Sequence, residues 1–185
     1  MLKSSAQNWG WGVKLFHWLS AALVLYLLAD GWWMTHLAAR AGRLTQYRSH
    51  AVLGYNVLLL FALRLAWRGA DRATPGIPVG ARLREWRAAR GTHALLYVLV
   101  IAVSITGWLL AGTFREPLAG SLLGVIPVPM LTRDLSLHRP MEEAHAMLSY
   151  VLLAVFVLHF AAALRHRFLL RSDVWDRMTW RGRRS

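Results

Sequence analysis

Two histidines, His145 and His159, lie fourteen residues apart at the last long apolar stretch of the chain. Fourteen residues of α-helix turn through about 1400°, about 40° short of four full turns, so both imidazoles point to nearly the same face. They are about 21 Å apart along the helix axis, whereas a bilayer core is about 30 Å thick. One membrane-crossing helix therefore offers one imidazole to each half of a membrane.

Two further histidines lie on apolar segments at matching depths. His17 is near the inner end of the first segment and His50 is at the outer start of the second, where inner denotes the side of the N-terminus. We expect His17 to meet His159 and His50 to meet His145. Two neutral imidazoles fill both axial positions of a haem iron, which leaves one-electron transfer as its chemistry. The spacing therefore predicts two stacked haem sites.

Zinc is a weaker candidate for these histidines. It needs about four ligands, and no carboxylates are expected in the span interiors to supplement the imidazoles. A single histidine near a helix end, such as His93, can also be an interfacial hydrogen-bonding residue. The chain has no cysteine, which excludes disulfides, cysteine-ligated clusters and covalently attached haem.

The composition is that of a membrane protein. The 185 residues are 56% hydrophobic, and apolar segments at about 13–33, 47–67, 93–111 and 145–165 predict four membrane spans. The first span lacks a small-residue cleavage site after it and is read as retained. We expect an all-α fold, a single transmembrane four-helix bundle over residues 1–185 that holds two b-type haems between facing helices.

Basic residues set the expected orientation. Sixteen lie on one side: Lys3, Lys14, Arg64, Arg68, Arg72, Arg82, Arg84, Arg87, Arg90, Arg165, Arg167, Arg171, Arg177, Arg181, Arg183 and Arg184. Six lie on the other: Arg40, Arg43, Arg48, Arg115, Arg133 and Arg139. The positive-inside rule then places both termini in the cytoplasm, and the basic inner surface should attract anionic lipid. Because the positive charge lies between apolar runs, nucleic-acid binding is not expected.

The connections differ in character. Residues 74–80 (TPGIPVG) read as a Pro/Gly linker, and residues 82–90 (RLREWRAAR) as a short amphipathic helix on the inner surface. The longest connection, 112–143, contains four prolines and the apolar run LLGVIPVPML, which we expect to cap the outer end of the bundle.

Small and basic residues near the histidines each have two possible roles. Gly54, one turn after His50, either lets a porphyrin approach the backbone or allows close helix packing, and Gly107 and Ala163 share both readings. Lys14 and Arg64 either pair with haem propionates or extend to lipid headgroups.

Several motifs together resemble one family. They are Lys-Leu-Phe-His17-Trp, His50-Ala-Val-Leu-Gly54, Arg90-Gly-Thr-His93-Ala-Leu-Leu-Tyr97, Thr106-Gly-Trp-Leu and the spacing of His145 and His159. Jointly they resemble the bacterial cytochrome b561 family, whose studied member is a superoxide oxidase. The layout is more distantly similar to the haem-b membrane subunits of hydrogenases and formate dehydrogenases.

The resemblance implies two b-type haems in the bacterial inner membrane and ubiquinone as substrate, with His93 and Tyr97 at the quinone site rather than on iron. It implies an oxidoreductase that passes electrons from an outer donor, superoxide in the studied member, to ubiquinone. Outer arginines would then attract the anion: Arg48, Arg115, Arg133 and Arg139. The alternatives are a haem-b anchor subunit that links a hydrogenase- or dehydrogenase-type protein partner to the quinone pool, and a bundle without haem.

Overall fold

Four long helices make up most of the chain. The computed structural model describes residues 1–37, 42–77 and 82–180. Its long helices are α1 (Trp11–His36), α2 (Arg43–Ala70), α3 (Leu83–Gly112) and α4 (His138–Phe168). Shorter elements are β1 (Ser121–Leu122), β2 (Ile126–Pro127), the 3-10 helix η2 (Leu135–Leu137) and α5 (Val174–Met178).

All four predicted spans coincide with a long helix, which confirms the four-helix membrane fold. Each of the four helices is long and apolar enough to cross a bilayer. Large apolar side chains face outward on them; Val98 is 62% exposed and Leu158 is 68% exposed. Apolar surface of this extent is stable against hydrocarbon and not against water.

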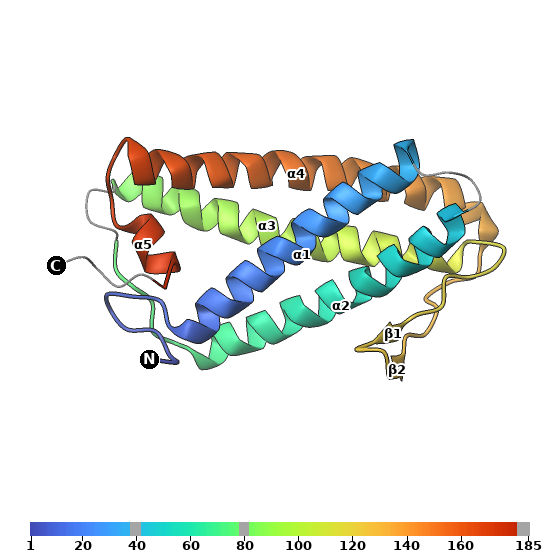
Figure 1. Cartoon of the computed structure of the whole chain (residues 1–185), viewed down its shortest axis with the longest axis horizontal. Coiled ribbons are helices and arrows are strands. Elements are labelled where there is room, and N and C mark those ends of the chain that lie inside the picture. Colours follow the sequence, from blue (N-terminus) through green and yellow to red (C-terminus); the bar gives the residue numbers. More distant parts are fainter. Residues whose placement is uncertain (38–41, 78–81, 181–185) are drawn as a thin grey trace.

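The helices pack in chain order, α1 on α2, α2 on α3 and α3 on α4. α1 crosses the bundle at a slant in Figure 1, whereas α3 and α4 run alongside each other. In the part of the chain that the structure describes, α4 forms no comparably close pair with α1 or α2. Side chains on α4 therefore face α1 and α2 across a wider gap than those between packed neighbours.

Two apolar clusters hold this arrangement. The first lies along the middle of the bundle and contains Val24, Val57, Phe61, Leu99, Val100 and Leu152. The second lies toward the outer end, where Tyr55, Ala111, Leu118 and Val128 fasten the α3–α4 connection to α2 and α3. Between them the clusters draw on all four helices.

The α3–α4 connection covers the bundle only in part. Leu118 and Val128 are buried, and Trp108 Nε1 donates to the Pro129 carbonyl at 2.8 Å. Between Leu118 and Val128, strands β1 and β2 form an antiparallel hairpin. The tip of this hairpin is exposed, and Leu123 is 74% exposed. Leu123 and Gly124 both have positive φ, as a type I′ turn requires. The hairpin lies beside α2 in Figure 1. The connection that was expected to cap the outer end of the bundle therefore also covers part of its side.

The predicted surface helix at residues 82–90 is wrong. These residues are the first turns of α3, which runs without a break from Leu83 to Gly112. Gly91 alone does not end a helix, and no proline lies between it and the end of α3 at Gly112. The basic residues at the start of α3 belong to the part of a long span that leaves the apolar layer. His166 also lies within α4.

The inner end joins distant parts of the chain. Lys14 Nζ donates to the Thr179 carbonyl at 2.7 Å, and Trp18 Nε1 donates to the Met178 carbonyl at 2.9 Å. Arg177 Nη1 donates to the Gly76 carbonyl at 2.7 Å. The start of α1, the α2–α3 connection and the segment after α4 therefore lie at one end of the bundle. Arg40, residues 78–80 of the predicted linker, Arg181, Arg183 and Arg184 lie outside the described residues.

Asp71 ties the N-terminal segment to the end of α2. Its carboxylate accepts from Ser4 N at 3.0 Å and from Ser4 Oγ at 2.6 Å, and Asp71 is 2% exposed. We predict that Asp71→Ala lowers the free energy of unfolding by about 1–3 kcal/mol, because it removes a buried acceptor and leaves these partly buried donors without it. Thermal unfolding in detergent measures the effect. The matched control is Asp176→Ala at the same end, which removes only an exposed ion pair with Arg167 and should change stability by about 1 kcal/mol or less. Equal losses from both variants would contradict the prediction.

Candidate functional site

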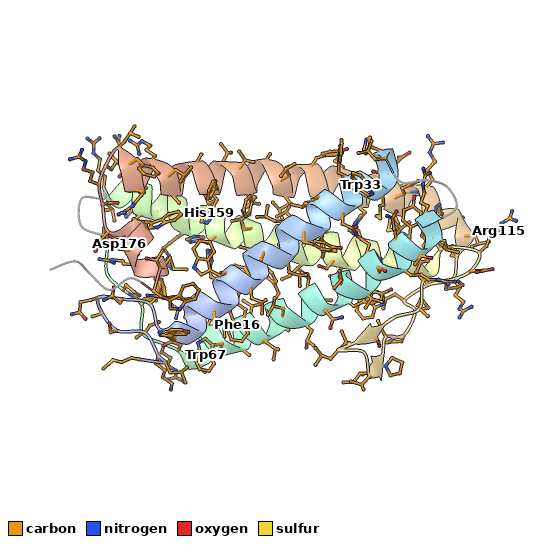
Figure 2. All side chains as sticks on the ribbon, in the orientation of Figure 1. Phe16, Trp33, Trp67, Arg115, His159 and Asp176 are labelled. Atoms are coloured by element: carbon orange, nitrogen blue, oxygen red, sulfur yellow. The ribbon has the colours of Figure 1, made fainter. Side chains whose placement is uncertain are left out.

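The structure brings His17 and His159 together in the inner half of the bundle. Their ring centroids are 6.3 Å apart and their planes are inclined at 65°. His17 comes from α1 and His159 comes from α4. Figure 2 shows the side chain of His159 in the half of the bundle that also holds α5. We call these two residues the inner pair.

His50 and His145 meet in the outer half. Their centroids are also 6.3 Å apart, with the planes at 88°. His50 comes from α2 and His145 from α4. We call these residues the outer pair. Both pairs bridge helices that are not closely packed neighbours. Each pair contains one of the two histidines that lie fourteen residues apart on α4.

The separation of each pair suits a metal ion between two axial imidazoles. A metal–imidazole bond is about 2 Å long and the ring centroid lies about 1 Å behind its nitrogen, so two such ligands place their centroids about 6 Å apart. Within residues 1–37, 42–77 and 82–180, no group of three or more histidine or acidic side chains is gathered for metal binding. The donor set is therefore one of facing pairs, which fits a planar macrocycle better than tetrahedral zinc.

Hydrogen bonds orient the outer pair. Asp30 Oδ2 lies 3.0 Å from His50 Nδ1, and both side chains are mostly buried, at 18% and 16% exposed. His145 Nδ1 lies 2.9 Å from the Val103 carbonyl and 3.3 Å from Thr106 Oγ1. With Nδ1 engaged on each ring, Nε2 is the nitrogen left for a metal, as in carboxylate–histidine–metal arrangements. Asp30 also corrects the expectation that the span interiors hold no carboxylate.

Glycines make room for these rings. A Cβ on Gly107 would lie 2.8 Å from His145 Cε1, and one on Gly31 would lie 3.4 Å from His50 Cε1. Gly107 therefore accommodates the imidazole itself, and the reading that its backbone contacts a porphyrin is not supported. A Cβ on Gly54 would meet no described atom within 4 Å, so the α2 surface one turn below His50 is open.

A small, partly open pocket of about 60 Å³ lies at the inner pair, and both of its imidazoles line it. His93 and Tyr97 of α3 line it together with the inner pair and Arg64. The centroids of His93 and His159 are 5.1 Å apart, which is too close for an ion between axial ligands. The inner pair therefore remains the better ligand set, and His93 lies next to it.

The two basic candidates are placed differently. Lys14 is held by the Thr179 carbonyl. Arg64 Nη2 donates to His17 Nδ1 at 3.2 Å, and its guanidinium lies over the rings of Phe61 and Tyr97, 5.7 Å and 5.1 Å from their centroids. A ring that accepts at Nδ1 carries its proton on Nε2. Metal binding at Nε2 would therefore move that proton to Nδ1 and turn the guanidinium away from it.

Two of the four outer arginines are neutralised by acids. Arg48 Nη2 pairs with Glu116 Oε2 at 3.3 Å, and Arg139 Nε pairs with Glu143 Oε1 at 2.8 Å. Arg115 projects from the outer end of the molecule, away from the helices, in Figure 2. Arg48 and Arg139 are thus engaged in exposed ion pairs rather than in contacts with the outer pair.

Four spans with two facing imidazole pairs describe a membrane electron-transfer protein. Residues 8–181 match the family described as prokaryotic cytochrome b561, and the chain belongs to that family. It is 29% identical over 165 residues to a protein of Escherichia coli (strain K12) named cytochrome b561 homolog 2, an alignment that covers 88% of this chain and 86% of that protein.

Membership of this family implies b-type haem. The residues present fit such a group, because neutral imidazoles face each other at the right separation across helices that stay apart. Asp30, Thr106 and the Val103 carbonyl are contributors that sequence reasoning missed. A carboxylate near a span end is unremarkable in a sequence, and its contact with His50 depends on how α1 crosses α2.

We predict that Gly107→Ala lowers the haem bound per chain, because the added methyl group displaces His145. The haem-to-protein ratio of the purified protein measures it. Gly91→Ala is the control on the same helix, since its Cβ meets no described atom within 4 Å and alanine is the better helix former. The prediction fails if the two variants bind equal amounts of haem.

Proposed function

We propose that this chain is a di-haem electron-transfer protein of the bacterial inner membrane that passes electrons from a donor at the outer face to ubiquinone. The inner pair would hold one b-type haem and the outer pair the other. His93 and Tyr97 would bind the quinone beside the inner pair. The observation that carries this proposal is the repetition of one 6.3 Å imidazole separation in the two halves of the bundle.

The protein's own groups orient the ligands of the outer pair. Asp30 accepts from His50 and the Val103 carbonyl accepts from His145, so both rings are fixed in orientation and tautomer. Gly54 leaves the α2 surface beside His50 open to a macrocycle. Arg64 lies beside His17 and packs over Phe61 and Tyr97, which keeps its positive charge next to the inner pair. Haem with two axial imidazoles supplies one-electron transfer and offers no open position for oxygen.

His93 is suited to handle the quinone's protons. It lines the pocket of the inner pair, and a neutral imidazole has one nitrogen that donates a proton and one that accepts a proton. Quinone reduction consumes two electrons and two protons, so the two-electron acceptor has to collect two single electrons in sequence. A proton-exchanging side chain next to the inner pair supports the quinone site there.

Superoxide is the proposed donor by analogy with the studied family member. In the balanced reaction, two superoxide anions and ubiquinone with two protons yield two O2 and one ubiquinol. The pairing of Arg48 and Arg139 with acids means that attraction of the anion would rest on the remaining cations, among them Arg115 and Arg133.

The proposed orientation follows from charge. The structure puts the N-terminal segment and α5 at one end of the bundle, where most of the basic residues of the described chain also lie. The positive-inside rule makes this end cytoplasmic. The quinone site would then lie in the cytoplasmic half and the donor site would face outward.

The decisive assay mixes purified haem-loaded protein with ubiquinone and an enzymatic source of superoxide. We expect superoxide loss and ubiquinol formation in a ratio of two to one, both dependent on protein and quinone. Superoxide loss no faster than spontaneous dismutation would reject superoxide as the donor. If a hydrogenase- or dehydrogenase-type enzyme then co-purifies and its substrate reduces the haem, the anchor-subunit alternative is correct instead.

We predict that the wild-type protein binds two haems per chain and that His17→Ala and His50→Ala each bind about one. Each substitution removes one axial ligand from a different site. Haem extraction and a reduced-minus-oxidised spectrum measure the ratio. His166→Ala is the control, because that ring contacts Ser172 outside both pairs. The prediction of two separate sites would be contradicted if either variant lost both haems. It would also be contradicted if either variant kept both.

We predict that His93→Ala slows ubiquinol formation by about tenfold or more while both haems remain bound, because a proton donor is lost without loss of a ligand. Stopped-flow oxidation of the reduced protein by ubiquinone measures the rate. His166→Ala again serves as the comparison. If His93→Ala loses a haem, the histidine is a ligand and its proposed role is wrong.

A further inference from the structure

Two charges of opposite sign lie within hydrogen-bonding reach of the histidine pairs. Asp30 Oδ2 is 3.0 Å from His50 Nδ1 in the outer pair. Arg64 Nη2 is 3.2 Å from His17 Nδ1 in the inner pair. Ionisable residues inside spans are costly, and those that persist usually serve the site they touch. The placement of one acid at one pair and one base at the other therefore calls for a functional reason.

Asp30 acts on the outer pair through His50. A carboxylate that accepts from Nδ1 makes the imidazole a stronger donor to a metal at Nε2. Its negative charge also favours the more positive oxidation state of that metal. At 18% side-chain exposure, water screens the charge only partly. Across the pair, His145 Nδ1 donates to the neutral Val103 carbonyl and lies near the neutral Thr106 hydroxyl, so its hydrogen-bond partners in the described chain carry no charge that offsets Asp30.

Arg64 acts on the inner pair with the opposite sign. Its guanidinium packs over the rings of Phe61 and Tyr97, which contact each other, so its charge stays beside His17 whichever nitrogen it faces. No ion pair in the described chain includes Arg64, and a guanidinium remains protonated in proteins. A positive charge at this place favours the less positive oxidation state of a metal held by the inner pair.

We propose that Asp30 lowers the reduction potential of the outer haem and Arg64 raises that of the inner haem, so that electrons run from the outer face inward. The inference rests on the proposed function, since it takes both pairs to ligate haem. With haem held by both pairs, one electron would pass from the reduced site at the outer pair to the oxidised site at the inner pair. No bond forms or breaks, and no further reactant is needed. Asp30 and Arg64 are positioning residues for this transfer.

The test is a spectropotentiometric titration of the purified two-haem protein and its variants. The His17→Ala and His50→Ala proteins assign each midpoint to its site. We expect Asp30→Asn to raise the lower, outer midpoint and Arg64→Gln to lower the higher, inner midpoint. Each shift should be at least a tenfold change in the electron-sharing constant between the sites, which is about 59 mV for one electron. The other midpoint should move much less.

Charge-preserving variants separate charge from shape. Asp30→Glu and Arg64→Lys should stay near the wild-type midpoints. Equal shifts in these and in the neutral variants would overturn the proposal, as would an outer midpoint above the inner one in the wild type. Loss of the outer haem from Asp30→Asn would make Asp30 a structural support and remove it from the proposal. The exposed controls Glu143→Gln and Arg165→Gln should leave both midpoints unchanged.

The outcome is distinguishable from a failure of the proposed function. A wild-type protein that binds one haem or none would refute the two-site function before any midpoint is compared. A protein that binds two haems, oxidises superoxide with ubiquinone and shows unshifted midpoints in both neutral variants would keep the proposed function and reject the charge asymmetry.

Discussion

The structure depends on keeping two pairs of imidazoles face to face at a fixed separation inside a membrane. His17 and His50 reach their partners on α4 across gaps that backbone packing does not close. Packing of α1 against α2 and of α3 against α4 stabilises the bundle instead. α4 can therefore lie farther from α1 and α2. A polar ring in hydrocarbon is costly unless it is bonded, and a metal at Nε2 together with a hydrogen bond at Nδ1 satisfies both nitrogens.

The two ends of the bundle serve this core differently. At the inner end, Asp71, Lys14 and Trp18 bind backbone and side-chain groups of segments far away in the chain, which fixes the start of α1 and hence the depth of His17. At the outer end, the α3–α4 connection packs on Tyr55 and Trp108 and leaves its hairpin tip exposed. The inner end is therefore built for position and charge, whereas the outer end combines an anchored connection with an exposed hairpin tip.

Much of the fold and part of the site could be predicted from the chain itself. Histidines stand out in apolar spans because they are costly there, and helical periodicity converts their spacing into depth and direction. The partner of His50 on α1, Asp30, could not be found in this way, because the contact depends on the slant of α1 against α2. The role of Gly107 likewise depends on which side chain fills its space. The prediction of a separate surface helix at residues 82–90 was wrong. A basic amphipathic pattern is also typical of the turns by which a long membrane-spanning helix extends beyond the apolar layer.

The central claim, that each imidazole pair holds one haem iron on both axial sides, is tested most directly by low-temperature electron paramagnetic resonance of the oxidised wild-type protein. We predict two distinct low-spin ferric signals of comparable integrated intensity, because both irons have two strong axial nitrogen ligands and different surroundings. A dominant high-spin signal, which reports an open axial position, or a single low-spin species would contradict it.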